Sequence, residues 1–119
     1  MKSARLLTLF LLVILSSCAS TPKPSLAGDW AGTLNIGGGS LRLIFHITEE
    51  DAAYKVFIES VDQGNVMIPT ELAVNEEELT FTVDNLNVKY VARMQGNQIQ
   101  CTFTQFGNTV EGFTIARSN

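Results

Sequence analysis

From Asp29 to Arg117 the sequence alternates between apolar and polar residues, and short turn-forming segments interrupt this alternation. A period of two residues is typical of β-strands that bury one face and expose the other, and no segment has a convincing helical period. The alternating stretches number about eight and lie within residues 30–36, 41–48, 54–59, 66–74, 79–83, 86–94, 99–103 and 113–117. Their connections are short enough for hairpins between antiparallel neighbours. The sequence therefore predicts an all-β fold.

One apolar face per strand suits a sheet that curls around a single core. Eight strands of this length favour an up-and-down β-barrel, because closure leaves no unpaired edge, and a two-sheet β-sandwich is the alternative. Pro69 interrupts the stretch 66–74, which suits an edge strand or a bulge. Bulky side chains occupy the predicted inward positions, which indicates a filled interior. These positions are Trp30, Leu34, Leu43, Phe45, Ile58, Phe81, Tyr90, Phe103 and Phe113.

Residues 1–17 differ in character from the alternating region. Lys2 and Arg5 precede the apolar run Leu6–Leu15, and no acidic residue occurs among them. As a helix this run would span about 15 Å, half of the roughly 30 Å hydrocarbon core of a membrane. The pattern therefore predicts a cleaved signal peptide and not a transmembrane helix.

The segment Leu15-Ser16-Ser17-Cys18 resembles the lipobox of bacterial lipoproteins. The resemblance implies cleavage before Cys18, a diacylglyceryl thioether on its sulfur and usually a third acyl chain, such as palmitate, on the new amine. Two or three chains give durable membrane anchoring. Ala19 follows the cysteine, and no acidic residue occurs before Asp29, which resembles the default for transfer to the outer membrane, facing the periplasm.

After the signal peptide we expect a lipid-anchored tether over residues 18–27 and a β domain over residues 28–117. Pro22 and Pro24 lie in the polar part of the tether and favour an extended, polyproline-like conformation.

The charge balance bears on the class of partner. Removing Lys2 and Arg5 from the eight basic residues leaves six against twelve acidic residues, a net charge of −6. Nucleic-acid binding needs a basic face, so we expect no nucleic acid as a partner. One histidine and two cysteines also exclude most zinc sites and disulfide scaffolds.

Candidate catalytic residues are few. His46 is predicted to point outward as a surface histidine, and Cys101 shares a face with Ile99 and Phe103, which indicates a buried, inert thiol. The chain contains no Gly-x-Ser-x-Gly nucleophile elbow and no Ser-x-x-Lys motif. We therefore predict no catalytic residue, no metal site and no cofactor.

Four loops contain residue types that occur in binding sites. Gly37–Ser40 lacks the following Lys-Ser/Thr and helix of a phosphate loop, so it is interpreted as a hairpin connection. Glu49–Asp51 and Glu76–Glu78 lack the oxygen spacing of a calcium loop and are interpreted as solvated turns. The fourth loop consists of Asp62, Gln63, Gly64 and Asn65. It is the candidate contact loop, although turn chemistry alone explains Asp and Gly there.

Several segments resemble a small β domain that precedes α/β-hydrolase or serine β-lactamase-like catalytic domains in exported bacterial proteins. The matching segments are Gly28–Leu34, Leu41–Ile47, Ser60–Gly64, Ile68–Pro69, Gln105–Gly107 and Phe113–Arg117. The sequence departs from that pattern at Ala92 and Cys101, where the family usually has glycine, and at Gly112, where it often has proline. The resemblance implies the fold, whereas the activity of the longer proteins resides in domains outside this match.

A broader resemblance is to the calycins, the lipocalin-like barrels. Their first strand carries Gly-x-Trp, which Gly28-Asp29-Trp30 matches, and an arginine near the last strand lies across the Trp ring. Arg117 is placed for this role, so the resemblance implies that Trp30 and Arg117 form a structural pair at one end of the barrel, joined by cation–π packing.

Three functions remain open at this point. The first is a non-enzymatic accessory or protein-interaction module that docks onto an envelope protein, such as a separate hydrolase. The second, by analogy with calycins, is a carrier of a small apolar ligand, although bulky inward residues oppose it. The third is a hydrolase, which the missing nucleophile and base make the weakest.

Overall fold

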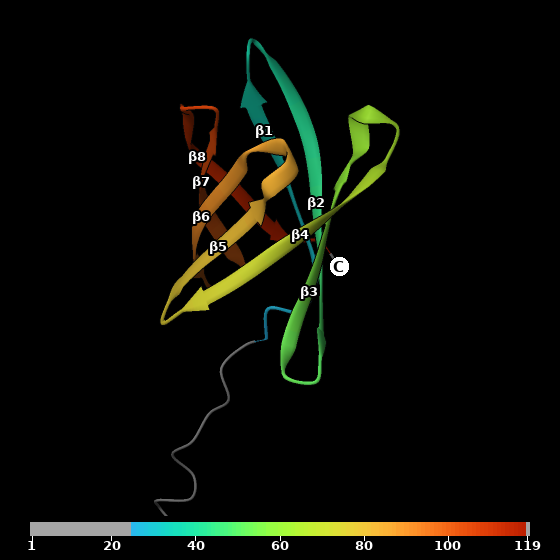
Figure 1. Cartoon of the computed structure of the whole chain (residues 1–119), viewed down its shortest axis with the longest axis vertical. Helices are drawn as coiled ribbons and strands as arrows, with labels where there is room; N and C mark the ends of the chain where they lie inside the picture. Colours follow the sequence, from blue (N-terminus) through green and yellow to red (C-terminus); the bar gives the residue numbers. More distant parts are fainter. Residues whose placement is uncertain (1–24, 119) are drawn as a thin grey trace, which may run out of the picture.

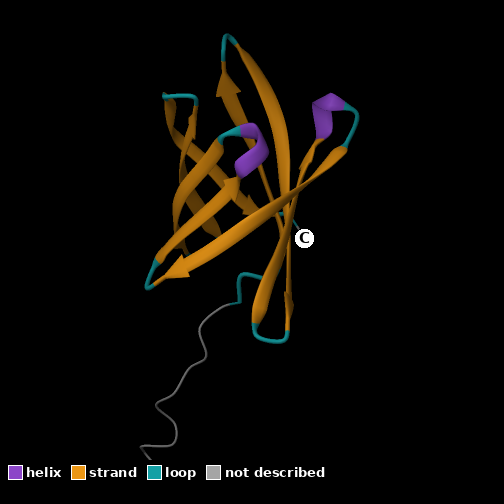
Figure 2. Ribbon diagram, in the orientation of Figure 1, coloured by secondary structure: helices purple, strands orange, loops and turns teal. Residues whose placement is uncertain are grey.

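The computed structural model describes residues 25–118, which form one closed antiparallel sheet of eight strands in up-and-down order (Figure 1). The predicted β-barrel is therefore confirmed, and the β-sandwich alternative is wrong. The strands are β1 (Gly28–Ile36), β2 (Gly39–Glu50), β3 (Ala53–Ser60), β4 (Val66–Asn75), β5 (Glu78–Val83), β6 (Val88–Gln95), β7 (Gln98–Gln105) and β8 (Asn108–Arg117). Two short 3₁₀ helices, η1 (Val61–Gln63) and η2 (Asp84–Leu86), interrupt the strand connections (Figure 2).

The first and last strands close the barrel. Trp30 pairs with Arg117 and Ala31 pairs with Ala116 across the β1–β8 seam. Gly32 follows directly, and a Cβ atom at this position would lie 2.3 Å from the backbone oxygen of Thr114. The seam therefore depends on glycine at position 32, because only a residue without a side chain allows β8 to approach so closely.

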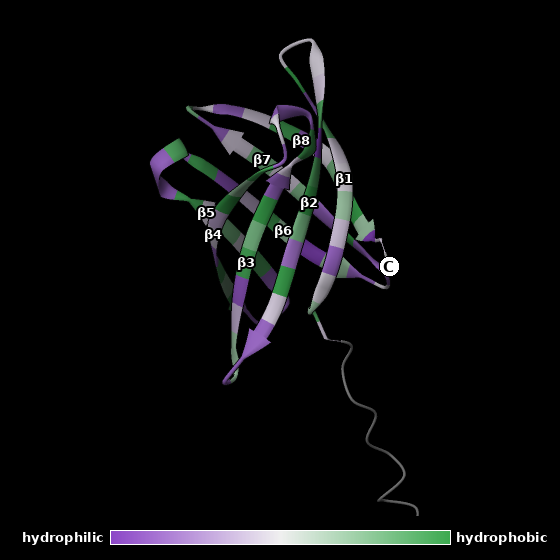
Figure 3. Ribbon diagram, turned by 90° about the vertical axis from the view of Figure 1, so that its right-hand side faces the viewer, coloured by the Kyte–Doolittle hydropathy of each residue, from purple (hydrophilic) through white to green (hydrophobic). Residues whose placement is uncertain are grey.

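Alternation along the strands produces the core (Figure 3). All nine residues expected to point inward are at most 4% exposed. Leu26 is buried beside them, so the core begins two residues before the expected start of the β domain at Gly28. Five aromatic rings, those of Phe45, Phe81, Tyr90, Phe103 and Phe113, contact one another in the interior.

Leu86 departs from the expected alternation. We expected it to begin the inward face of the strand that contains Val88, but it lies in η2 and is 41% exposed. The connection is longer than the sequence indicates because Asn87 adopts a left-handed conformation, and its N–H donates to the Asp84 carbonyl oxygen at 3.1 Å. Polar residues such as Asn tolerate this conformation and end the turn.

The last strand is longer than expected and contains a bulge. On β7, Cys101 and Phe103 are two residues apart, whereas their partners on β8, Phe113 and Val110, are three apart. Gly112 lies between those partners with a φ of 81°, which glycine adopts without strain. The bulge reverses which residues of β8 point inward. Even-numbered positions face the core before Gly112, and odd-numbered positions face it after Gly112.

The barrel has two distinct ends (Figure 1). Four connections gather at the end where β1 finishes, and we call this end the rim: residues 37–38, 61–65, 84–87 and 106–107. The opposite end contains the first residue of β1 and the turns at residues 51–52, 76–77 and 96–97. The N-terminal segment therefore joins the barrel at the end remote from the rim.

Candidate functional site

The candidate contact loop lies on the rim, and its side chains bind the rest of the barrel. The Asp62 carboxylate accepts hydrogen bonds from the Arg42 guanidinium on β2 at 2.6 and 3.0 Å and from the Arg42 backbone N–H at 2.9 Å. The hydrogen bonds from the Arg42 side chain and backbone hold the pKa of Asp62 below its usual value. Asp62 therefore fixes the loop against the neighbouring strand.

The other residues of this loop also have structural partners. Gln63 accepts a hydrogen bond from the buried Ser60 hydroxyl at 2.7 Å, and the Asn65 amide donates to Glu59 at 2.6 Å. Gly64 has a φ of 79°, which suits glycine. The contact role of Asp62, Gln63, Gly64 and Asn65 stays a prediction, and turn geometry and internal hydrogen bonds account for all four residue types.

Exposed apolar side chains occupy the same rim, although the sequence pattern did not indicate them. Val66 and Met67 directly follow the contact loop and are 47% and 48% exposed, and Leu86 and Phe106 are 41% and 72% exposed. The Gln105 side chain, next to Phe106, donates a hydrogen bond to the Leu86 carbonyl oxygen at 3.0 Å. This bond links the two connections that carry Leu86 and Phe106. We call Val66, Met67, Leu86 and Phe106 the apolar rim.

Phe106 occupies a position that its side chain does not favour. It is the first residue of the two-residue turn between β7 and β8 and has a φ of 48°, with Gly107 second at 82°. Turns with two left-handed residues prefer Asn-Gly or Asp-Gly, because left-handed geometry costs most other residues roughly 1–2 kcal/mol. A large, exposed aromatic ring at such a position is a sign of function. The Phe-Gly pair at a hairpin turn was the signal available in the sequence.

His46 lies on the outer face of the barrel, as expected, but it has partners on two other strands. Its Nδ1 atom is 2.8 Å from Asp29 on β1, and its Nε2 atom is 2.9 Å from Glu59 on β3. Partial burial lowers the pKa of His46, but the hydrogen bonds and charges of Glu59 and Asp29 outweigh it and hold the pKa above the usual value. The imidazole thus bridges three adjacent strands. Both of its nitrogens are engaged by carboxylates, which leaves none directed at a substrate.

Trp30 and Arg117 meet at the end opposite the rim, where the resemblance to calycins placed them. The Arg117 guanidinium carbon lies 4.2 Å from the centre of the Trp30 ring, so the predicted contact is confirmed. Arg117 also donates hydrogen bonds to the backbone oxygens of Ala27, at 2.9 Å, and Ser25. The indole N–H donates to the Leu26 carbonyl oxygen at 2.9 Å. The pair therefore holds the segment that leads into β1.

The remaining nucleophile and metal-ligand candidates add no reactive group. Cys101 is a buried free thiol, and burial raises its pKa to about 12, which suppresses the nucleophilic thiolate. Among residues 25–118 no three His, Cys, Asp or Glu side chains gather closely enough to hold a metal ion. The absence of catalysis and of a cofactor stays a prediction.

Cys18 and the predicted signal peptide lie outside the described residues. Within residues 25–118, no helix is long and apolar enough to cross a membrane. Comparison of the chain with protein-family models, curated proteins and solved structures finds no match.

Proposed function

We propose that this chain is a lipid-anchored, non-enzymatic module of the bacterial envelope whose rim docks onto an envelope protein. The observation that carries the proposal is the apolar rim, with Phe106 72% exposed in a turn that disfavours it. Leu86 lies close to Phe106, because the neighbouring Gln105 side chain donates a hydrogen bond to the Leu86 carbonyl oxygen. Exposed apolar side chains mark interaction sites, and aromatic residues are enriched among the anchors of protein interfaces. A hydrolase supplied as a separate chain is the partner that the resemblance suggests.

The position of the N-terminal segment supports the same proposal. The chain joins the barrel at the end opposite the rim, where Trp30 and Arg117 hold residues 25–27 (Figure 1). A lipid anchor at Cys18, by way of a short tether, therefore leaves the apolar rim directed away from the membrane. In the outer membrane of a diderm bacterium, facing inward, the rim would meet proteins of the periplasm.

The packing of the interior favours docking over the transport of a small apolar ligand. Phe45 lies at the centre of the aromatic cluster, with ring centroids 5.1 Å from Phe81 and 5.2 Å from Tyr90 in edge-to-face geometry. Such pairs are stabilising contacts that a ligand would have to displace. The packed interior therefore supports binding of a partner at the outer surface and not binding of a ligand inside the barrel.

The decisive variant is Phe106→Asn, because asparagine suits the turn while the apolar anchor is lost. We expect equal or higher stability, by up to about 1 kcal/mol, and loss of the protein that the wild type captures after cross-linking in membranes. Val91→Thr, at an exposed position on β6, is the matched control and should capture the same protein. Equal capture by Phe106→Asn, or no specific protein with the wild type, would contradict the proposal.

The anchor is tested separately. If Cys18 is the sole membrane attachment, Cys18→Ser yields an unprocessed precursor or a soluble form, which fractionation and mass spectrometry distinguish from the lipidated protein. A Cys18→Ser protein that still fractionates as a lipidated membrane protein would show that the lipobox interpretation is wrong.

A further inference from the structure

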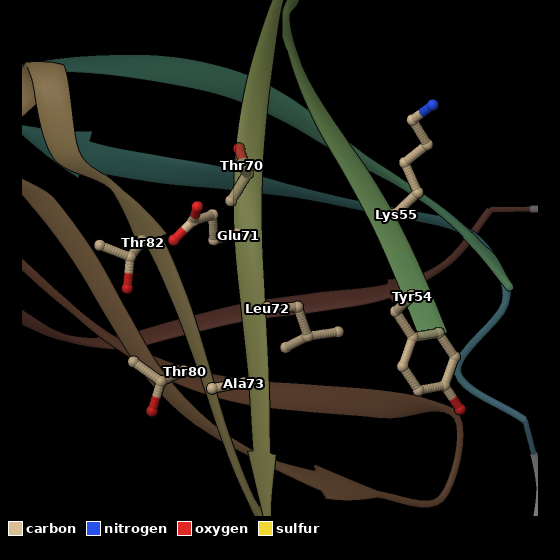
Figure 4. A pocket seen from close by; sticks show the side chains of 8 residues that line it. All are labelled: Tyr54, Lys55, Thr70, Glu71, Leu72, Ala73, Thr80 and Thr82. Carbon is tan, nitrogen blue, oxygen red and sulfur yellow. The ribbon is translucent and has the colours of Figure 1, made fainter. Parts of the chain in front are cut away.

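Strands β3 and β4 separate toward the end of the barrel opposite the rim. They pair only between Val56–Ser60 and Val66–Thr70, and β4 then pairs with β5 from Glu71 to Asn75. A groove of about 400 Å³ lies where the two strands part (Figure 4). Its lining residues are Tyr54, Lys55, Thr70, Glu71, Leu72, Ala73, Thr80 and Thr82. Within the described residues, β4 is thus not paired with β3 beyond Thr70, although the sheet as a whole is closed.

Pro69 shows which backbone groups face this groove. In an antiparallel sheet, alternate residues direct their N–H and C=O groups to opposite neighbouring strands. Proline has no N–H to donate, so Pro69 is not one of the β4 residues whose backbone bonds to β3. The residues that bond to β3 are therefore the even-numbered ones, such as Thr70. The backbone of Pro69 is directed toward β5, at a point before the β4–β5 ladder begins at Glu71. By the same phase, Leu72 and Val74 direct their backbone groups toward β3.

Leu72 and Val74 have no strand partner on that side within the described part of the chain, because the β3–β4 register ends at Val56 and Thr70. On the facing side, Tyr54 of β3 likewise has no partner on β4. The groove is therefore bordered by the backbone donors and acceptors of Leu72 and Val74 on β4, which are two residues apart, and by those of Tyr54 on β3. An extended peptide matches this spacing, and addition of a strand to a free edge is an established mode of peptide recognition.

The side chains at the groove define what such a peptide should carry. Leu72 and Tyr54 are partly buried and border the space between the strands (Figure 4). A peptide residue that faces the barrel interior would therefore be apolar. Glu71 and Lys55 occupy the outward positions beside them.

The ends of the two separating strands are acidic. The β2–β3 turn follows Glu49 and Glu50 and contains Asp51, and the β4–β5 turn and the residue after it contribute Glu76, Glu77 and Glu78. Glu77 forms an ion pair with Arg93 at 3.8 Å, and both side chains are exposed. A second copy of this chain would bring like charges together if it paired edge to edge. A basic segment would meet charges of opposite sign.

We propose that the free edge of β4 at Leu72 and Val74 binds an extended, basic segment of a partner protein, with an apolar residue directed between Leu72 and Tyr54. The bound segment pairs as an additional strand and fills the opening between β3 and β4. This inference goes beyond the proposed docking function of the rim. It concerns a surface separate from the apolar rim. Loss of peptide binding at β4 can therefore be measured while partner capture by the rim is retained.

A heptapeptide of sequence Lys-Thr-Val-Thr-Val-Thr-Lys with blocked ends is the probe, titrated into the isotopically labelled β domain with its tether. We expect the amide signals of Leu72 and Val74 to shift and saturate. The same peptide with both valines N-methylated, which cannot pair as a strand, should bind at least about tenfold more weakly, and so should its counterpart with terminal glutamates. Raising the salt to about 0.5 M should weaken binding of the basic peptide.

Val74→Pro removes only a groove-facing N–H and leaves the ladder to β5 intact, so the variant should fold and lose peptide binding. Ala73→Pro is the matched control, because Ala73 pairs with Thr80 and loss of its N–H should destabilise the barrel. Val74→Pro should still capture the rim partner, which separates this inference from the proposed function.

Hydrogen exchange of the free wild-type protein provides a test that needs no variant. The amides of Leu72 and Val74 should exchange much faster than those of Glu71 and Ala73, which face β5. Equal protection of all four amides in the free protein would overturn the inference, because the edge would then be occupied. Equal binding of the N-methylated peptide would overturn it as well.

Discussion

The guanidinium of Arg117 lies over the indole ring of Trp30, 4.2 Å from the ring centre, and the two residues are direct partners across the seam that closes the barrel. One side chain belongs to the first strand and the other to the last. Their hydrogen bonds to Ser25, Leu26 and Ala27 hold the N-terminal segment against the same end. A single contact thus joins barrel closure to the segment that leads into β1.

Trp30→Ala should reduce the free energy of unfolding by about 3–5 kcal/mol, because the fully buried ring leaves a large cavity. Arg117→Ala should cost less, about 1–2 kcal/mol, through the loss of cation–π packing and of its hydrogen bonds to the backbone. Urea denaturation measures both. A larger cost for Arg117→Ala than for Trp30→Ala would contradict the view that the buried ring is the main contributor.

Gly32→Ala should destabilise the barrel by about 1–3 kcal/mol, because the added methyl group would lie 2.3 Å from the Thr114 oxygen and 2.9 Å from Ile115. Gly39→Ala is the matched control, since its methyl group would approach nothing closer than the Ile36 oxygen at 3.9 Å. Thermal unfolding compares the two. A Gly32→Ala protein as stable as Gly39→Ala would show that the seam adjusts without cost.

His46 should make stability depend on pH. Its pKa is raised in the folded state, so its contribution is complete below the unfolded value of 6.5 and is lost as the pH rises through the folded value. The pKa of Glu59 is lowered by its hydrogen bonds to His46 and Asn65, so its contribution is present above the unfolded value of 4.5 and is lost as the pH falls through the folded value.

The test of this pH dependence is His46→Gln. The difference in unfolding free energy between wild type and His46→Gln should be larger near about pH 6 than near about pH 8.5. Urea denaturation at both values gives the two differences. The same difference at both would mean that the bridge to Asp29 and Glu59 contributes nothing that depends on protonation of the imidazole.

Cys101 should react with a thiol reagent only when the barrel opens, because it is 4% exposed and its pKa is raised to about 12 by burial. In a Cys18→Ser background, labelling at about pH 8 should be at least about a thousandfold slower in buffer than in denaturant. Rapid labelling of the native protein would reveal a local opening near β7 that the packed core does not suggest.

The candidate site was only partly predictable from the sequence. Asp62 and Gly64 were recognised as turn residues, but their function could not be separated from turn formation, because the partner Arg42 lies twenty residues away on another strand. His46 was expected at the surface, and its bridge to Asp29 and Glu59 was not foreseen. Such contacts depend on which residues on neighbouring strands lie beside one another, and this register is set by turns and bulges.

By itself the sequence determined the all-β class, the number of strands and which face of most strands is buried, since a period of two residues is a local property of the chain. Only the tertiary structure decided where that alternation fails. Gly112 reverses the phase of β8, Leu86 leaves the strand for a turn, and β4 changes partner from β3 to β5 after Thr70. The end of β3–β4 pairing at Thr70 and the proximity of Phe106 to Leu86 on the rim depend on how the strands are placed in the closed sheet, which brings together residues far apart in the chain.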